Sequence, residues 1–133
     1  MFDEILELCK ELAEKRSWIR KGFEEFITRL ENVLKENLKD DVPIVKIGVY
    51  TDEIVNAPMY VFYVPKEKKI CCEFEIERWK KFNPNTLSIV EIKRLVRSIP
   101  EVISKEIEKL KSISQDDSQI IDILKKMNSV FSK

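Results

Sequence analysis

The first third of this chain carries a heptad pattern that almost fills one long helix. Apolar residues recur every seven positions, at Ile5, Leu12, Ile19, Phe26 and Val33. A second series follows four residues after each of these, at Cys9, Arg16, Phe23, Leu30 and Asn37. This alternation predicts a helix with a coiled-coil seam. A helix of about 35 residues is roughly 50 Å long, whereas a compact globule of this size has a radius of gyration of about 14 Å. We therefore expect the helix to break or to find a partner, and a second copy of the chain is the simplest one.

The predicted helix runs from about Asp3 to Leu38. Gly22 costs about 1 kcal/mol in a helix interior, so a break between Ser17 and Gly22 is an open alternative. Arg16 is a charged residue inside the seam, where such a residue can set the register of paired helices. We expect a homodimer through this helix; the competing possibility is that the seam packs within one molecule.

The composition excludes many classes of enzyme. The chain has 133 residues, enough for one domain with its own core, and no histidine, which removes the usual acid–base group near neutral pH. Three cysteines without histidine cannot complete a tetrahedral zinc site. The two glycines, Gly22 and Gly48, lie too far apart to form a phosphate-binding loop. We expect no catalytic residues, no metal and no cofactor.

The cysteines and the N-terminus indicate an intracellular protein. No apolar run approaches the roughly 18 residues of a membrane span, and the acidic start MFDEILELCK is unlike a signal peptide, so we expect a cytoplasmic chain without a membrane partner. An odd number of cysteines, two of them adjacent, does not form a disulfide framework. We expect Cys9 and Cys72 to be buried as small apolar residues. Abundant Lys, Ile and Glu with two glycines is typical of a thermophile.

Three segments within residues 44–79 have the composition of strands. They are Ile44–Thr51, Met59–Val64 and Lys69–Trp79. A polar loop, residues 66–68, joins the last two, so an antiparallel meander is the economical topology. Period-two alternation places an inward set on the first and third strands: Val45, Ile47, Val49, Ile70, Cys72, Phe74 and Ile76. The opposite face would then carry Tyr50, Tyr60 and Phe62.

The C-terminal part, residues 86–131, predicts two to three helices. Ser88 and Glu91 have the spacing of a capping box at the start of the first. Pro100 interrupts the helical pattern and either kinks this helix or starts a new one. A polar linker is expected at Ser112–Ser118, followed by a short helix over Gln119–Phe131. With the first helix (1–38) and the meander, these elements predict a single α+β domain over residues 1–133.

An outward acidic row on the third strand is the one candidate for a divalent metal. It comprises Glu73, Glu75 and Glu77, and it would need help from Asp52 or Glu53, because alternate strand residues are about 6.6 Å apart. The order of elements is similar to that of the PD-(D/E)xK nuclease core. However, the strand reads Glu75-Ile76-Glu77-Arg78 and lacks the lysine of that motif. A solvated strand face is the expected role, and a metal-dependent nuclease is a distant third possibility.

The stretch from Arg78 to Arg97 is basic and contains aromatic residues. Its basic residues are accompanied by only one acidic residue, Glu91, and Trp79 and Phe82 lie among them in the sequence. Cations for phosphates and flat rings for bases are what a single nucleic-acid strand needs. The candidate nucleic-acid-binding set is Arg78, Trp79, Lys80, Lys81, Lys93, Arg94, Arg97, Tyr60 and Phe62.

The layout from Glu4 to Leu110 resembles the small single-stranded-DNA-binding proteins of archaeal rod-shaped viruses that lack an OB-fold. The resemblance rests on the order of elements and on the turn Arg78-Trp79-Lys80-Lys81-Phe82, followed by Thr86-Leu87-Ser88. It implies a dimer that binds single strands without sequence preference. The alternative is an adaptor or inhibitor that binds a protein partner through the seam of the first helix.

Overall fold

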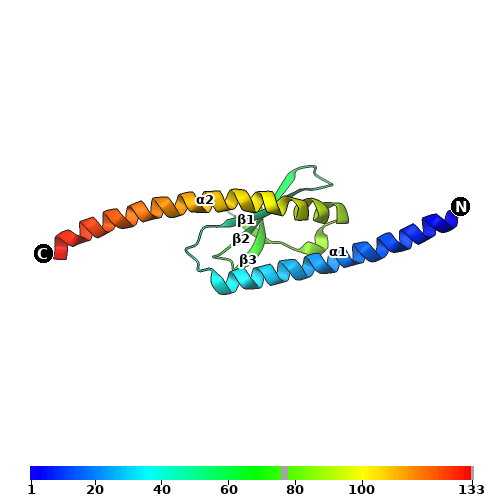
Figure 1. The fold of residues 1–133 in the computed structure, drawn as a ribbon, viewed down its shortest axis with the longest axis horizontal. Helices are drawn as coiled ribbons and strands as arrows, with labels where there is room; N and C mark the ends of the chain where they lie inside the picture. The colour runs from blue at the N-terminus through cyan, green and yellow to red at the C-terminus, as the bar shows by residue number, and fades with distance from the viewer. Residues whose placement is uncertain (76–77, 133) are drawn as a thin grey trace.

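The computed structural model describes residues 1–75 and 78–132, without the side chains of residues 74 and 75. Two long helices pack against one side of an antiparallel sheet in the strand order β1-β2-β3-β4 (Figure 1). The elements are α1 (Phe2–Asn37), β1 (Val45–Thr51), β2 (Pro58–Val64), β3 (Lys69–Glu75), β4 (Arg78–Lys81), the 3₁₀ turn η1 (Pro84–Thr86), α2 (Ile89–Ser129) and the 3₁₀ turn η2 (Val130–Ser132). The α+β fold with a long N-terminal helix is therefore confirmed.

Both long helices are continuous. α1 has 36 residues and passes through Gly22 without the break that remained open. Phe23 and Ile27 are buried just after that glycine, and their packing outweighs its poor helix propensity. α2 has 41 residues and contains Pro100 in its interior.

The predicted division of the C-terminal part into two or three helices, with a linker at Ser112–Ser118, is wrong. An apolar stripe continues along α2 on both sides of Pro100 and offsets the one backbone hydrogen bond that a proline removes. The capping box is confirmed: Glu91 N donates to Ser88 Oγ at 3.2 Å, and Ser88 N donates to Glu91 Oε1 at 2.8 Å.

The sheet has four strands, so the prediction of three is wrong. The segment predicted as one strand, Lys69–Trp79, contributes all of β3 and the start of β4. These two strands pair antiparallel, with Cys71 opposite Lys81 and Glu73 opposite Trp79. The register shifts between Glu73 and Glu75, an irregularity that period-two alternation does not show. The predicted positions of Phe74, Glu75, Ile76 and Glu77 fall on side chains outside the described residues.

A bulge in β1 reverses the predicted faces of that strand. Pairing with β2 skips one residue between Lys46 and Gly48, so Ile47 is the extra residue. Beyond it, Gly48 and Tyr50 are buried on the core side. Val49 pairs with Tyr60 on the other side. The prediction that Val49 faces inward and Tyr50 outward is therefore wrong.

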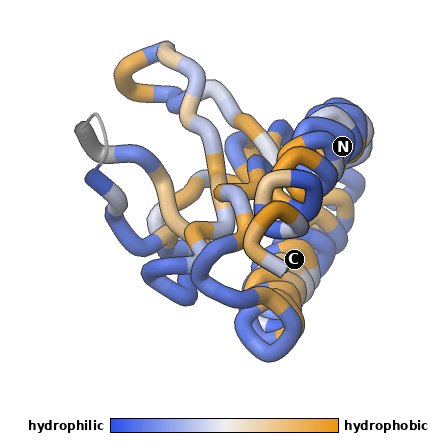
Figure 2. Tube along the Cα trace, turned by 90° about the vertical axis from the view of Figure 1, so that its left-hand side faces the viewer, coloured by the Kyte–Doolittle hydropathy of each residue, from blue (hydrophilic) through white to orange (hydrophobic). Residues whose placement is uncertain are grey.

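One face of the sheet forms the core with both helices. Figure 2 shows the helices on one side of the molecule and the strands extending away from them. Tyr63 and Ile70 of the sheet are fully buried, with Phe23 of α1 and Leu95 of α2 in the same cluster. α1 is further held by Glu31, whose Oε2 accepts a hydrogen bond from Ile70 N at 2.9 Å. In the C-terminal half of the α1 seam, Phe23 and Leu30 therefore pack within the molecule, whereas Phe26 and Val33 are exposed.

Side chains of α2 occupy the outer edge of β1. Val49 N donates to Ser98 Oγ at 2.9 Å, and Lys46 N donates to Glu106 Oε2 at 3.1 Å. The second bond gives the buried carboxylate of Glu106 a hydrogen-bond partner. The edge is thus covered against pairing with another chain, while among the described residues no helix lies over the face of the sheet opposite the core (Figure 2).

The N-terminal end of α1 and the C-terminal end of α2 extend beyond the sheet, at opposite ends of the molecule (Figure 1). Every residue from 1 to 18 of the N-terminal end and from 114 to 132 of the C-terminal end is exposed. We call these segments the α1 arm and the α2 arm. In the part of the chain that the structure describes, no helix has a stretch long and apolar enough to cross a membrane.

Candidate nucleic-acid interface

The uncovered side of the sheet, here called the open sheet face, is defined by strand register. Residues directly opposite one another in paired strands share a face. One such row crosses all four strands, and further pairs flank it. The row is Lys46, Phe62, Cys71 and Lys81, and the flanking pairs are Val49 with Tyr60 and Glu73 with Trp79.

Three aromatic residues of the predicted set meet on this face and form an aromatic cluster. The ring centroids of Phe62 and Trp79 are 5.2 Å apart at an interplanar angle of 70°. Those of Tyr60 and Phe62 are 6.4 Å apart and tilted by 44°. Tyr60 is 42% exposed, so its ring is accessible to a ligand. The structure thus brings together rings from β2 and β4 that are far apart in the sequence.

Lys46 belongs to this site, although it is absent from the predicted set. Its Nζ lies 4.5 Å from the centroid of the Tyr60 ring and 5.9 Å from that of Phe62. A cation over a ring face is a favourable contact, and it holds a positive charge beside a stacking surface. The signal was present in the sequence, because Lys46 alternates out of phase with Val45 and Ile47, but it lay outside the basic stretch.

The basic residues of β4 divide between the two faces of the sheet. Trp79 and Lys81 are on the open sheet face by register. Arg78 and Lys80 alternate with them and therefore point to the other side. Glu73, opposite Trp79, adds one negative charge to the open sheet face.

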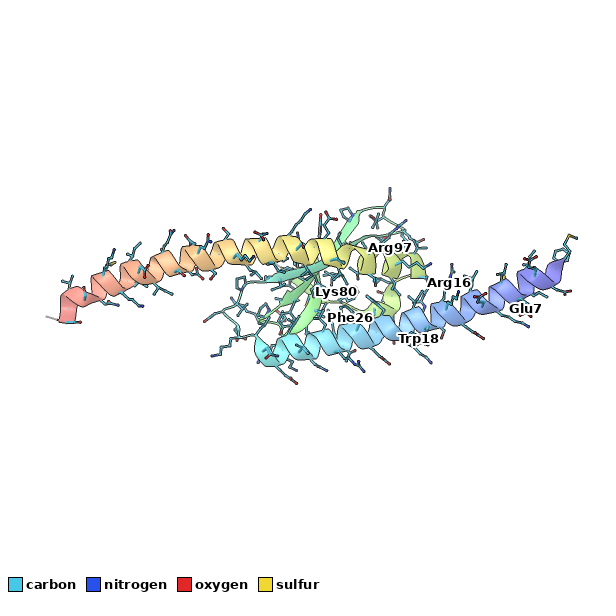
Figure 3. The ribbon with its side chains drawn as sticks, viewed as in Figure 1. Glu7, Arg16, Trp18, Phe26, Lys80 and Arg97 are labelled. Atoms are coloured by element: carbon cyan, nitrogen blue, oxygen red, sulfur yellow. The ribbon has the colours of Figure 1, made fainter. Side chains whose placement is uncertain are left out.

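The three cations of α2 do not join the aromatic cluster. Arg94 is at the end of β1, where its Nη1 donates to Thr51 O at 3.1 Å. Lys93 and Arg97 are four residues apart, on the side of α2 turned away from Leu95. In Figure 3, Arg97 and Lys80 come from different elements, α2 and β4. The predicted set is therefore brought together only in part.

Tyr50, expected beside Tyr60 and Phe62, is in the core instead. Its hydroxyl is removed from water, and burial, with smaller effects from Cys72 and Glu91, raises the pKa of Tyr50 to about 12. It is not available for stacking.

One of the three cysteines departs from expectation. Cys9 is exposed on the α1 arm, so the prediction that it is buried is wrong. Cys72 is half-buried on the core side, and Cys71, on the open sheet face, is only 2% exposed. Burial raises the pKa of each of the two adjacent thiols to about 11.

The raised pKa values of Cys71 and Cys72 predict that the fold loses stability at alkaline pH. Both pKa values rise on folding from 9.0 to about 11, so the stabilisation is complete below pH 9 and is lost as the pH rises towards 11. We expect the free energy of unfolding, measured by urea titration, to fall over this window. Cys71→Ala should make the fall smaller, and an equally steep fall in that variant would contradict the assignment.

The acidic residues do not form a metal site in the described structure. Asp52 Oδ1 accepts hydrogen bonds from Ile54 N and Val55 N, both at 2.8 Å, and so stabilises its own turn. Glu73 is exposed, while the side chains of Glu75 and Glu77 lie outside the described residues. Within residues 1–75 and 78–132, no three potential ligands lie close enough together to hold a metal ion.

Comparison with known proteins adds no assignment. No protein-family model matches this sequence, and no curated protein or solved structure matches it significantly.

Proposed function

We propose that this chain is a non-catalytic, sequence-tolerant single-stranded nucleic-acid-binding protein that acts as a homodimer. One observation carries the proposal: three aromatic rings from β2 and β4 form a cluster on a sheet face that no helix of the described structure covers, with Lys46 against the rings. Lys81 lies on the same face.

The chemistry of this face suits an unpaired strand. Bases of a single strand can stack on exposed rings, and each stacked base contributes about 1–3 kcal/mol whatever its identity. Tyr60 and Trp79 offer such surfaces, with Phe62 between them supporting both. Lys46 and Lys81 would neutralise phosphates along the same row of the sheet.

Trp79→Ala is expected to weaken binding of a labelled single-stranded oligonucleotide by about 5- to 150-fold, the equivalent of one lost stacking contact. Fluorescence anisotropy at several salt concentrations measures this, with single-stranded and duplex probes compared. Lys46→Gln should make the logarithm of the binding constant fall less steeply with the logarithm of the salt concentration, by the amount expected for about one phosphate contact.

Trp18→Ala is the matched control, because Trp18 is 78% exposed on α1 and the sheet does not cover it. It should leave the affinity unchanged. Equal losses for both tryptophans, or no binding at low salt, would overturn the proposal.

A second candidate is a protein-interaction adaptor, favoured by exposed apolar surface on the helices. A groove of about 440 Å³ between α1 and α2 is lined mainly by apolar residues, among them Trp18, Phe26, Val96 and Pro100. A protein that ignores oligonucleotides and loses a partner on Phe26→Asp would support this candidate instead.

A further inference from the structure

Each arm carries its own heptad seam of exposed residues. On the α1 arm the seam is Phe2, Ile5, Cys9, Leu12 and Arg16. On α2 the seam passes through the half-buried Ile113 and continues along the α2 arm as Asp117, Ile120, Leu124, Met127 and Phe131. Both series alternate steps of three and four residues, the spacing of helices that pair along their length.

These seams are extensions of faces that are covered near the sheet. The α1 seam leads into Ile19 and Phe23, which pack on the core, and the α2 seam follows Ile99 and Glu106. Beyond the sheet the same faces are open: Leu12 is 51% exposed and Leu124 is 49% exposed. Amphipathic helices owe most of their stability to packing of the apolar face, so a partner is missing at both ends.

The two arms match in length and lie at opposite ends of the molecule (Figure 1). Each has close to 18 exposed residues, or about 27 Å of helix. Because both helices run in the same direction, a two-fold rotation places the α1 arm of one copy beside the α2 arm of the other, antiparallel. One operation then covers all four arms and leaves no arm free.

The charged seam residues select this orientation. Arg16, on the α1 arm beyond the sheet (Figure 3), and Asp117 are the charged residues of the two arm seams. When the start of α1 lies antiparallel beside the end of α2, Arg16 and Asp117 come within about one a/d layer of each other along the paired helices. A parallel pairing that aligned them would place residues 124–131 along residues 23–30 of α1, which already pack on the sheet.

We infer that two copies of this chain form a closed dimer by exchanging arms, with α1 of one copy antiparallel to α2 of its partner and Arg16 facing the partner's Asp117. A buried charge pair of this kind fixes register more than it adds affinity. The inference does not depend on nucleic-acid binding, because the arms and the open sheet face are separate surfaces.

Charge reversal tests the pairing. Arg16→Asp and Asp117→Arg should each raise the dimer dissociation constant at least fivefold in sedimentation equilibrium, measured without nucleic acid. The double variant Arg16→Asp/Asp117→Arg should recover the affinity, because the two charges exchange places. The matched controls are Lys10→Asp and Asp122→Arg, which make the same charge changes on exposed sides of the arms turned away from the seam and should have little effect.

Disulfide trapping tests the orientation. In a Cys9→Ala background, the pair Phe2→Cys and Phe131→Cys should form a disulfide between two chains, since these positions are at opposite ends of one chain (Figure 1). The pair Phe2→Cys and Ile113→Cys should not. Cross-linking by the second pair alone would show a parallel, head-to-tail assembly and overturn the inference. A chain that stays monomeric at every concentration would also overturn the inference. So would a double variant that dimerises as weakly as the single variants. Loss of oligonucleotide binding with an intact dimer would bear only on the open sheet face.

Discussion

Leu95→Ala is expected to lower the free energy of unfolding by about 2–5 kcal/mol, the range for removing a large buried side chain. Leu95 is 1% exposed and belongs to the cluster that joins α2 to the sheet. Truncation leaves a cavity that neither the helix nor β1 can close, since Ser98 and Glu106 fix α2 on the strand edge. Urea unfolding followed by circular dichroism measures the change.

The neighbouring residue supplies the control. Val96 is 47% exposed, so Val96→Ala should cost less than 1 kcal/mol of stability, on the order of one partly buried group. Similar losses for the two variants would mean that α2 does not pack on the sheet through Leu95.

Gly48→Ala is expected to destabilise the fold by about 1–3 kcal/mol, the usual cost of overpacking. A Cβ atom at Gly48 would lie 2.6 Å from Leu95 Cδ1, 3.1 Å from Ser98 Oγ and 3.3 Å from Ile99 Cγ1. The side chains of α2 would have to shift, and the hydrogen bond from Val49 N to Ser98 would be strained. The same unfolding experiment measures the loss.

Gly22→Ala is the matched control and should change stability in the opposite direction. A Cβ atom there would meet only ring atoms of Trp18, at 3.8 Å, and alanine in a helix is favoured over glycine by about 0.5–1 kcal/mol. In the double variant Gly48→Ala/Leu95→Ala the added methyl group would enter the space vacated by the leucine. The combined loss should therefore be smaller than the sum of the two single losses; a fully additive loss would contradict the contact.

The long N-terminal helix was predictable because its apolar repeat is regular and local. The single helix α2 was harder to predict, because a proline such as Pro100 and a polar segment such as 112–118 usually mark the end of a helix. Their local cost is a few kcal/mol at most, and the continuous apolar stripe outweighs it. Sequence rules for helix ends therefore misjudged a helix that is stabilised along one face.

The strands show a different limit. Their existence followed from composition, but the faces of β1 depended on an extra residue at Ile47, and β3 pairs with β4 through a register shift between Glu73 and Glu75. Neither is visible in a period-two pattern, because a bulge changes pairing without changing composition.

The candidate site was predicted in its aromatic part and not in its charged part. Tyr60 and Phe62 share a face through simple alternation, and Trp79 joins them through pairing of β4 with β3. The cations of α2 were grouped with Trp79 because they are near it in the sequence. The angular position of each residue around a helix separates them in space.

The bulge in β1 also decides which side chains of this strand the open sheet face carries. If β1 paired regularly with β2 and Ile47 took a place in the ladder, the residues after it would exchange sides: Val49 would turn inward, and Tyr50 would turn outward beside the aromatic cluster. The core would lose an aromatic ring and the exposed side would gain one, with no substitution anywhere in the chain. Deleting Ile47 would remove the extra residue and leave Gly48, Val49 and Tyr50 on the sides that they now occupy, so the bulge is what keeps the Tyr50 ring in the core.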